Sequence, residues 1–347
     1  MSRKDDHVTI ANKFYQKQTN DFDKVRFIHQ NFSEVDVDEV DVKSNVESLN
    51  FEVPFFINAM TGGSQWTKTI NEKLALVAKE TNLVMATGSM SAAFKDDSTL
   101  DSYQIIKQVN PKGVRIANLQ ASASIDQVKQ AIEWLDASAI QLHVNVAQEI
   151  IMHEGDRHFK GWLDNIANVV SAIDLPIIIK EVGFGFSKQA IASLQSMGVQ
   201  NIDISGKGGT NFSMIENARN EHLMDYMNDW GQSTVCSLLE AASFNDLNII
   251  ASGGVRNMLD VTKALALNAK VVGMSGSILH LVGSLGVDQT IEVIQSYKQQ
   301  LKRIMALLNA SNVLDLGKTD LVFDEMIVSY AKQRNIDLTN YHFRTRK

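Results

Sequence analysis

Four polar residues in one short segment are the first candidates for catalysis. The segment HVNVAQE carries His143, Asn145, Gln148 and Glu149 at the end of an apolar run. A single histidine is more often a hydrogen-bonded core residue, and a single glutamate is often a solvated residue at a helix start, where the helix dipole favours it. Because the four residues follow one expected strand, we interpret them as parts of one site.

Lys180 is a further candidate because it ends the apolar run PIIIK. A buried ammonium group is costly unless an anion compensates its charge, so Lys180 should have an anionic partner. Two structural explanations stay open. The side chain could extend to solvent, or it could pair with the neighbouring Glu181.

Three glycine-rich segments could bind a phosphate group. They are SGKGGT (205–210), SGGVR (252–256) and SGS (275–277), and each follows a late strand. In α/β barrels, backbone N–H groups at these positions often bind phosphate, and glycine allows a close approach and a positive φ. One such motif could be only a tight turn. Three in consecutive loops favour a phosphate site.

The elements that must position these residues begin at Pro54, where short apolar runs start to alternate with amphipathic segments. This alternation is typical of a parallel sheet with covering helices. Helices are expected at 66–82, 125–135 and 187–198. The expected strands are 54–60, 83–89, 113–119, 138–144, 176–182, 201–205, 248–254 and 270–275.

Nearly every expected strand ends in a polar or glycine cluster, and in a closed barrel those ends meet on one face, where active sites lie. We therefore predict an α/β fold of the (β/α)8 TIM-barrel class, with a doubly wound open sheet as the alternative. The expected parts are an N-terminal arm (1–50), the FMN-binding barrel (51–310) and a C-terminal helical extension (311–347). Within the arm, residues 33–42 alternate acids with valine at the two-residue period of a half-exposed strand. The long connection 206–235 is expected to be a wall or lid.

Composition limits the class of protein. The formal net charge of −7 argues against broad nucleic-acid binding, which requires a basic face. Cys236 is the only cysteine, so a disulfide framework and a CxxC metal site are excluded, which fits a reducing cytoplasm. The start of the chain is unlike a signal peptide and no run of 18 apolar residues occurs, so we expect neither export nor a membrane span.

Taken together and in order, the motifs resemble the type 2 isopentenyl diphosphate isomerase family. The motifs are RKDDH, INAMTGG, TGS, LHVNVAQE, KEVGFG, SGKGGT, NDWGQST and ASGGVR, between residues 3 and 256. The resemblance implies a homo-oligomeric barrel, a tetramer or octamer, that interconverts isopentenyl and dimethylallyl diphosphate in isoprenoid biosynthesis. It also implies FMN as cofactor, NADPH as the source of reducing equivalents, and Mg2+.

The resemblance assigns roles to individual residues. Gln148, His143 and Lys180 are the implied catalytic residues, and Glu149 is the implied metal ligand. The implied substrate-binding residues are Arg3, Lys4, His7, His143, Asn145 and Gln148. The implied FMN-binding residues are Ala59, Met60, Thr61, Ser89, Asn118, Lys180, Ser205, Thr210, Gly253, Gly254, Val255, Gly276 and Ser277. Without the resemblance, the basic residues near the N-terminus would be read as a disordered start.

The chemistry of a double-bond shift fits these residue types. A proton must reach one alkene carbon and leave another, with no net redox change, and in the resembled family N5 of the reduced flavin is the proposed acid and base, with Gln148 as a relay. Lys180 beside the N1/O2 edge would stabilise an anionic flavin. Glu149 with Mg2+, and the basic residues of the arm, would neutralise the diphosphate.

Two other functions stay open. An FMN-dependent 2-hydroxy-acid oxidase or dehydrogenase would share the lysine and the phosphate loops, but it needs arginines for a carboxylate, and the RK…H arm with HVNVAQE fits the isomerase better. A non-catalytic barrel that binds a phosphate ligand is the second alternative. The joint presence of His143, Gln148, Glu149 and Lys180 argues against it.

Overall fold

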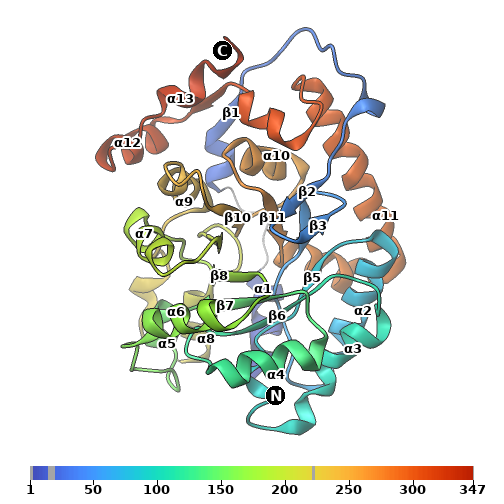
Figure 1. The fold of residues 1–347 in the computed structure, drawn as a ribbon, viewed down its shortest axis with the longest axis vertical. Helices are drawn as coiled ribbons and strands as arrows, with labels where there is room; N and C mark the ends of the chain where they lie inside the picture. Colours follow the sequence, from blue (N-terminus) through green and yellow to red (C-terminus); the bar gives the residue numbers. More distant parts are fainter. Residues whose placement is uncertain (1–2, 15–19, 221–222, 347) are drawn as a thin grey trace.

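A closed barrel of eight parallel strands forms the centre of the molecule, in the order β10-β11-β4-β5-β6-β7-β8-β9 (Figure 1). The computed structural model describes residues 3–14, 20–220 and 223–346, without the side chains of 3–4, 11–14 and 346. Each strand overlaps the run predicted for it, so the (β/α)8 barrel is confirmed. The strands are β4 (Phe55–Ile57), β5 (Met85–Ala86), β6 (Arg115–Gln120), β7 (Ala139–Val144), β8 (Ile177–Glu181), β9 (Asn201–Asp203), β10 (Asn248–Ser252) and β11 (Val271–Met274).

Amphipathic helices cover the outside of the barrel. In α2 (Gln65–Thr81), the Ser64 side chain caps the first turn, Leu74 and Val77 are buried, and the helix ends where Asn82 adopts the left-handed conformation. The helices predicted at 66–82, 125–135 and 187–198 are α2, α4 (Ile125–Leu135) and α7 (Lys188–Ser196). The others around the barrel are α3 (Asp101–Val109), α5 (Val146–Ile151), α6 (Trp162–Ala172), α8 (Phe212–Arg219), α9 (Thr234–Ala241), α10 (Met258–Ala266) and α11 (Gly276–Leu307).

A short hairpin closes the N-terminal end of the barrel. Its strands are β2 (Ser44–Val46) and β3 (Leu49–Phe51). Val46 and Phe51 are buried in one apolar cluster with Phe56, Ile116 and Ile178 of the barrel strands. This burial removes apolar surface from water and seals that end. The carboxyl ends of the strands therefore form the open end.

The two terminal regions pack against each other. In the arm, α1 (Arg3–Phe14) is followed by β1 (Val25–Phe27), which pairs antiparallel with β12 (Leu321–Phe323) of the C-terminal region. Beyond β12 lie α12 (Glu325–Gln333) and α13 (Thr339–His342), which appear beside β1 at the top of Figure 1. The arm and the C-terminal region thus share a two-stranded sheet outside the barrel.

The strand expected at 33–42 is wrong. Residues 37–39 form a single 3-10 turn, and Asp36 N–H donates to the Glu39 carboxylate across it. Val37 is exposed, so no apolar face favours an extended strand there. The Glu39 carboxylate caps this turn, and the Asp41 carboxylate accepts the Lys43 N–H just after it.

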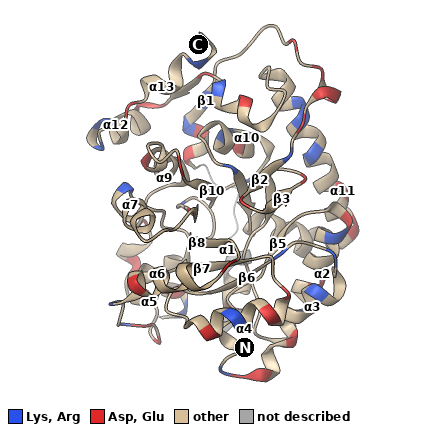
Figure 2. Ribbon diagram, viewed as in Figure 1, with Lys and Arg blue, Asp and Glu red and all other residues tan. Residues whose placement is uncertain are grey.

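Charged residues of both signs are mixed on the outer helices. Figure 2 shows Lys and Arg interspersed with Asp and Glu, for example on α4 and α11. In this view the Lys and Arg positions do not gather on one group of helices, in keeping with the acidic net charge. None of the described helices is long and apolar enough to cross a membrane.

Candidate active site

A pocket of about 890 Å3 opens at the carboxyl ends of the barrel strands. Every predicted site residue whose side chain is described lines this pocket, whereas the side chains of Arg3 and Lys4 lie outside the description. The roles given to these residues by resemblance stay predictions. The lining residues predicted from sequence are Ala59, Met60, Thr61, Ser89, Asn118, His143, Asn145, Gln148, Glu149, Lys180, Ser205, Thr210, Gly253, Gly254, Val255, Gly276, Ser277 and, from the arm, His7.

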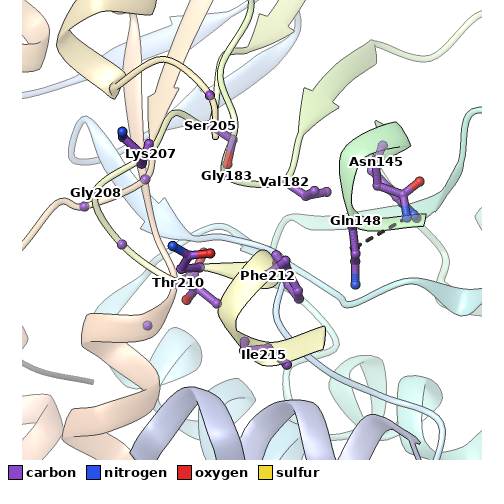
Figure 3. A pocket seen from close by; sticks show the side chains of 18 of the residues that line it. Asn145, Gln148, Val182, Gly183, Ser205, Lys207, Gly208, Thr210, Phe212 and Ile215 are labelled. Carbon is purple, nitrogen blue, oxygen red and sulfur yellow. Dashed lines mark hydrogen bonds between the residues drawn. The ribbon is translucent and has the colours of Figure 1, made fainter. Parts of the chain in front are cut away.

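The connection 206–235 forms one wall of the pocket, as its length suggested. Lys207, Gly208 and Thr210 lie on one side of the view in Figure 3, and Asn145 and Gln148 of the α5 region face them from the other side. The wall is stiffened by α8, whose first turn is capped by the Asn211 side chain. The segment is therefore an ordered wall in the described residues rather than an irregular loop.

Glu149 accepts hydrogen bonds at both carboxylate oxygens. Asn145 Nδ2 donates to Oε1 at 2.8 Å, and the backbone N–H of Asp156 donates to Oε2 at 2.7 Å. Gln120 Nε2 also approaches Oε1, at 3.4 Å. Since Glu149 is only 9% exposed, these bonds fix the direction of a nearly buried carboxylate at the pocket edge.

Gln148 and the arm meet at a buried acid that the sequence did not single out. Gln148 Nε2 donates to Glu216 Oε1 at 2.9 Å, and His7 Nε2 lies 2.9 Å from the same oxygen. Arg219 donates to Glu216 Oε2 at 2.5 Å. Burial by itself raises the pKa of Glu216, but the contacts with His7, Gln148 and Arg219 outweigh it and hold that pKa below the ordinary value. The residue was missed because its partners His7 and Gln148 are distant in sequence.

Lys180 is buried and has the anionic partner that the sequence led us to expect. Its Nζ donates to the Glu181 backbone oxygen at 2.6 Å and to Ser205 Oγ at 3.1 Å. The carboxylate nearest to it is that of Asp203, whose Oδ2 lies 3.8 Å from Nζ. The ammonium group is therefore compensated within the barrel mouth while still lining the pocket.

The Glu181 carboxylate binds backbone N–H groups of the loop that follows it rather than the Lys180 ammonium. Its Oε2 accepts the N–H groups of Val182, Gly183 and Phe184 at 2.5–2.8 Å. Burial nevertheless raises the pKa of Glu181 to about 7. The carboxyl group thus shapes the loop after β8 instead of pairing directly with Lys180.

The glycine-rich loops pack so closely that a larger residue would not fit. A Cβ on Gly253, whose φ is +93°, would lie 2.0 Å from the Gly206 oxygen. A Cβ on Gly209 would lie 2.6 Å from the Gly254 nitrogen. These loops flank the start of α11, where Ser277 lines the pocket. Backbone N–H groups of such loops, next to a helix N-terminus, are well suited to a phosphate.

Two buried hydroxyl groups in the pocket support a cofactor there. Thr61 Oγ1 and Ser277 Oγ have no hydrogen-bond partner within the described part of the chain. Buried polar groups are rarely left unsatisfied, so these two hydroxyls point to a bound molecule. One lies after β4 and the other beyond β11, the strand that pairs with β4. A flavin with its phosphate at the glycine loops and its ring near Lys180 fits this set of donors.

A complete protein metal cage is absent from the described residues, since no group of three His, Cys, Asp or Glu side chains gathers in them. Glu149 could still contribute one ligand. Mg2+ commonly keeps several waters and binds through one or two carboxylates together with substrate phosphates. The single carboxylate therefore fits a metal that arrives with its substrate.

The sequence is similar to enzymes of one named activity. A family model described as FMN-dependent dehydrogenase matches residues 99–323. An isopentenyl-diphosphate delta-isomerase of Staphylococcus haemolyticus is 48% identical over 338 residues, covering 97% of each chain. Isopentenyl-diphosphate delta-isomerase of Staphylococcus aureus is 45% identical over the same share of both chains.

Solved structures show the same fold at much lower identity. A mandelate oxidase variant with a monooxide FMN adduct has a TM-score of 0.65 at 14% identity and covers 92% of both chains. A flavocytochrome b2 variant with benzoylformate has a TM-score of 0.65 at 18% identity, covering 97% of this chain and 82% of its own. At these identities the likeness concerns the barrel alone.

Proposed function

The chain belongs to the type 2 isopentenyl-diphosphate delta-isomerase family, within the FMN-dependent dehydrogenase group, and we propose that it converts isopentenyl to dimethylallyl diphosphate at the pocket described above. The observation that carries the proposal is the presence of two separate polar regions in one pocket. The glycine loops around Gly253 suit one phosphate. His143 and Glu149, across the pocket, suit a second anion with its metal.

FMN is the cofactor that the first region fits. Its phosphate would bind at the loops of Gly253, Gly254 and Ser277, and its ring would lie beside Thr61 and Lys180. When bound and reduced, the flavin supplies a proton donor and acceptor at N5. The buried Lys180 ammonium would stabilise negative charge on the reduced flavin. The remaining FMN-binding assignments made by resemblance are part of this proposal.

Gln148 would guide the proton between cofactor and substrate. Its amide is held at both ends, because Asn145 Nδ2 lies 3.4 Å from its Oε1 and its Nε2 donates to Glu216. An amide fixed in this way presents one orientation to the pocket. Proton transfer depends on such fixed geometry, since the donor and acceptor must be within hydrogen-bond reach.

The substrate diphosphate would bind between the arm and α5. His7, His143 and Asn145 offer hydrogen-bond donors there, and Glu149 would hold Mg2+, whose charge would offset that of the diphosphate. Arg3 and Lys4 belong to the same proposal through the resemblance. NADPH as the source of reducing equivalents rests on the resemblance as well.

The chain is proposed to act as a homo-oligomer, a tetramer or octamer. The wall segment 206–235 itself exposes three large apolar side chains, Leu223, Tyr226 and Trp230, at 70%, 78% and 58%. A group of exposed apolar residues commonly marks an association surface. Light scattering of the FMN-loaded protein measures the oligomer directly, and a monomer would contradict this part of the proposal.

An FMN-dependent 2-hydroxy-acid oxidase is the second candidate, and the pocket argues against it. Such an enzyme needs an arginine to bind a substrate carboxylate. Among the described lining residues the arginine is Arg256, and its guanidinium is already bound to Asp23 and Asp260 at 2.7–3.0 Å. The arginine is therefore committed to holding the arm against the barrel.

The decisive experiment is anaerobic incubation of the purified protein with FMN, NADPH, Mg2+ and isopentenyl diphosphate. We expect the allylic diphosphate to accumulate over many turnovers while NADPH is consumed only once per flavin. Absence of the allylic product would overturn the proposal. Oxidation of mandelate or lactate with flavin reduction would favour the second candidate instead.

A further inference from the structure

A buried carboxylate lies beneath the pocket, among the carboxyl ends of the strands. Asp203 ends β9 and is fully buried. Its Oδ1 accepts from Ser252 Oγ at 2.6 Å and from the Ser205 N–H at 3.2 Å. Its Oδ2 accepts from Asn58 Nδ2 at 2.7 Å and lies 3.8 Å from Lys180 Nζ. Each of these neighbours offers a donor or a positive charge, so the carboxylate acts as an acceptor at both oxygens.

Three amide side chains connect this carboxylate to His143. Asn58 Oδ1 accepts from Gln141 Nε2 at 2.9 Å, and Gln141 Oε1 accepts from Asn118 Nδ2 at 2.9 Å. Asn118 Oδ1 lies 2.8 Å from His143 Nδ1. The chain of hydrogen bonds therefore runs through the barrel interior, from β9 past the end of β4 to β7 and β6.

The direction of every bond in this chain follows from its charged end. An ionised carboxylate only accepts hydrogen bonds, so Asn58 must turn its NH2 group toward Asp203 and its oxygen toward Gln141. The Ala59 N–H, which donates to Asn58 Oδ1 at 2.8 Å, is satisfied in the same orientation. The constraint then passes from amide to amide. Asn118 therefore presents its Oδ1 to the imidazole of His143, and this acceptor requires a proton on Nδ1.

The backbone leaves space for this network. A Cβ on Gly273 of β11 would lie only 2.4 Å from Asn58 Nδ2, so glycine at that position lets the amide cross. Asn58, Gln141 and Asp203 are each 0% exposed. Buried polar groups are costly unless all their partners are in place, so a continuous network of this kind is strongly specified.

We propose that Asp203 is a positioning residue that fixes the Nδ1–H tautomer of His143 from the other side of the barrel. When the ring takes up a further proton, Nε2 is then the nitrogen that gains an N–H. An N–H is the group that an anionic oxygen binds. A role of this tautomer in binding the diphosphate rests on the proposed function, whereas the presence of the tautomer does not.

The tautomer can be measured by nitrogen NMR on FMN-loaded protein labelled with 15N in its histidine rings. The His143 signals are identified by their loss in His143→Gln. At a pH where this ring is neutral, we expect the wild type to show the Nδ1–H pattern alone. In Asp203→Leu, which has no acceptor, and in Gln141→Met, which cuts the chain midway, we expect signals of the Nε2–H tautomer to appear.

Ser252→Ala is the matched control, because it removes one donor to Asp203 but leaves the acceptor for Asn58. This variant should keep the wild-type pattern. An unchanged pattern in Gln141→Met would overturn the proposal even if Asp203→Leu failed to fold. An Nε2–H pattern in the wild type would overturn it as well. Because the readout uses no turnover, failure of the isomerase assay would contradict the proposed function without affecting this result.

Discussion

Gln148 Nε2 donates to Glu216 Oε1 at 2.9 Å, and this bond joins α5 of the barrel to α8 of the pocket wall. His7 of α1 reaches the same oxygen at 2.9 Å. The arm, the barrel and the wall therefore meet at one buried carboxylate. A change at either contact alters how the other side chain is held.

Gln148→Ala is expected to abolish most turnover while FMN stays bound. The amide is held between Asn145 and Glu216, and truncation removes the group proposed to guide the proton. Loss of an acid-base group costs about 10²–10⁴ in kcat. Stopped assays of allylic product and the flavin absorbance of the purified variant measure both effects. Near-normal kcat would contradict a role in proton transfer, and Gln130→Ala, on the exposed side of α4, is the control.

His7→Ala is expected to raise the KM for isopentenyl diphosphate. A hydrogen bond to a charged group contributes about 1.5–3 kcal/mol, which corresponds to roughly tenfold or more in KM. Deleting residues 1–7 should raise KM further, because the proposed basic residues are then lost together. Steady-state kinetics of both variants test this, with the exposed His29→Ala as control. If KM stays at the wild-type value, the arm takes no part in substrate binding.

The barrel was predictable because each strand is a short apolar run of its own. PIIIK and NIIAS are short, rich in isoleucine and followed closely by glycine, and these features distinguish buried strands such as β8 and β10 from buried helices. The phosphate loops were predictable for a related reason. Glycines at 253 and 254 have positive φ and no room for a side chain, so that part of the sequence is dictated by local geometry.

Contacts between distant segments could not be predicted in the same way. Glu216 is one acid within an ordinary helical segment, and its partner His7 is 209 positions away. Gln141 and Asp203 did leave a signal, since each is a polar residue inside a buried strand. That signal shows that a polar partner must exist, but the partner is set by barrel closure. The prediction for segment 33–42 failed for the opposite reason, because the local turn in which the Glu39 carboxylate caps the Asp36 N–H outweighed the alternating pattern.

Gly253→Ala is expected to weaken FMN binding by about tenfold or more. A non-glycine residue at φ +93° bears strain of about 1–3 kcal/mol, and the new Cβ would also meet the Gly206 oxygen. The flavin content of the purified protein and titration of the apoprotein with FMN measure the loss. Gly283→Ala in α11 is the matched control, since nothing lies within 4 Å of its added Cβ. Equal FMN affinity in the two variants would show that the loop tolerates a side chain and does not form the phosphate site.

Glu181→Gln is expected to remove a pH dependence of the free energy of unfolding. Burial raises the pKa of Glu181 from 4.5 to about 7 in the folded protein, so the folded state holds a proton that the unfolded state releases. Its contribution to stability is fully present below pH 4.5 and is lost as the pH rises to about 7.

Urea unfolding of the wild type at pH 5 and pH 7.5 should therefore show a loss on the order of 1–3 kcal/mol that Glu181→Gln lacks. The neutral amide keeps an oxygen for the N–H groups of Val182, Gly183 and Phe184, so the loop after β8 should survive the change. Glu133→Gln, an exposed residue of α4, should retain the wild-type dependence. If Glu181→Gln kept the full pH dependence, the prediction would be wrong. The Glu181 carboxylate of the folded wild type would then be ionised already at pH 5, held in that state by the three backbone N–H donors.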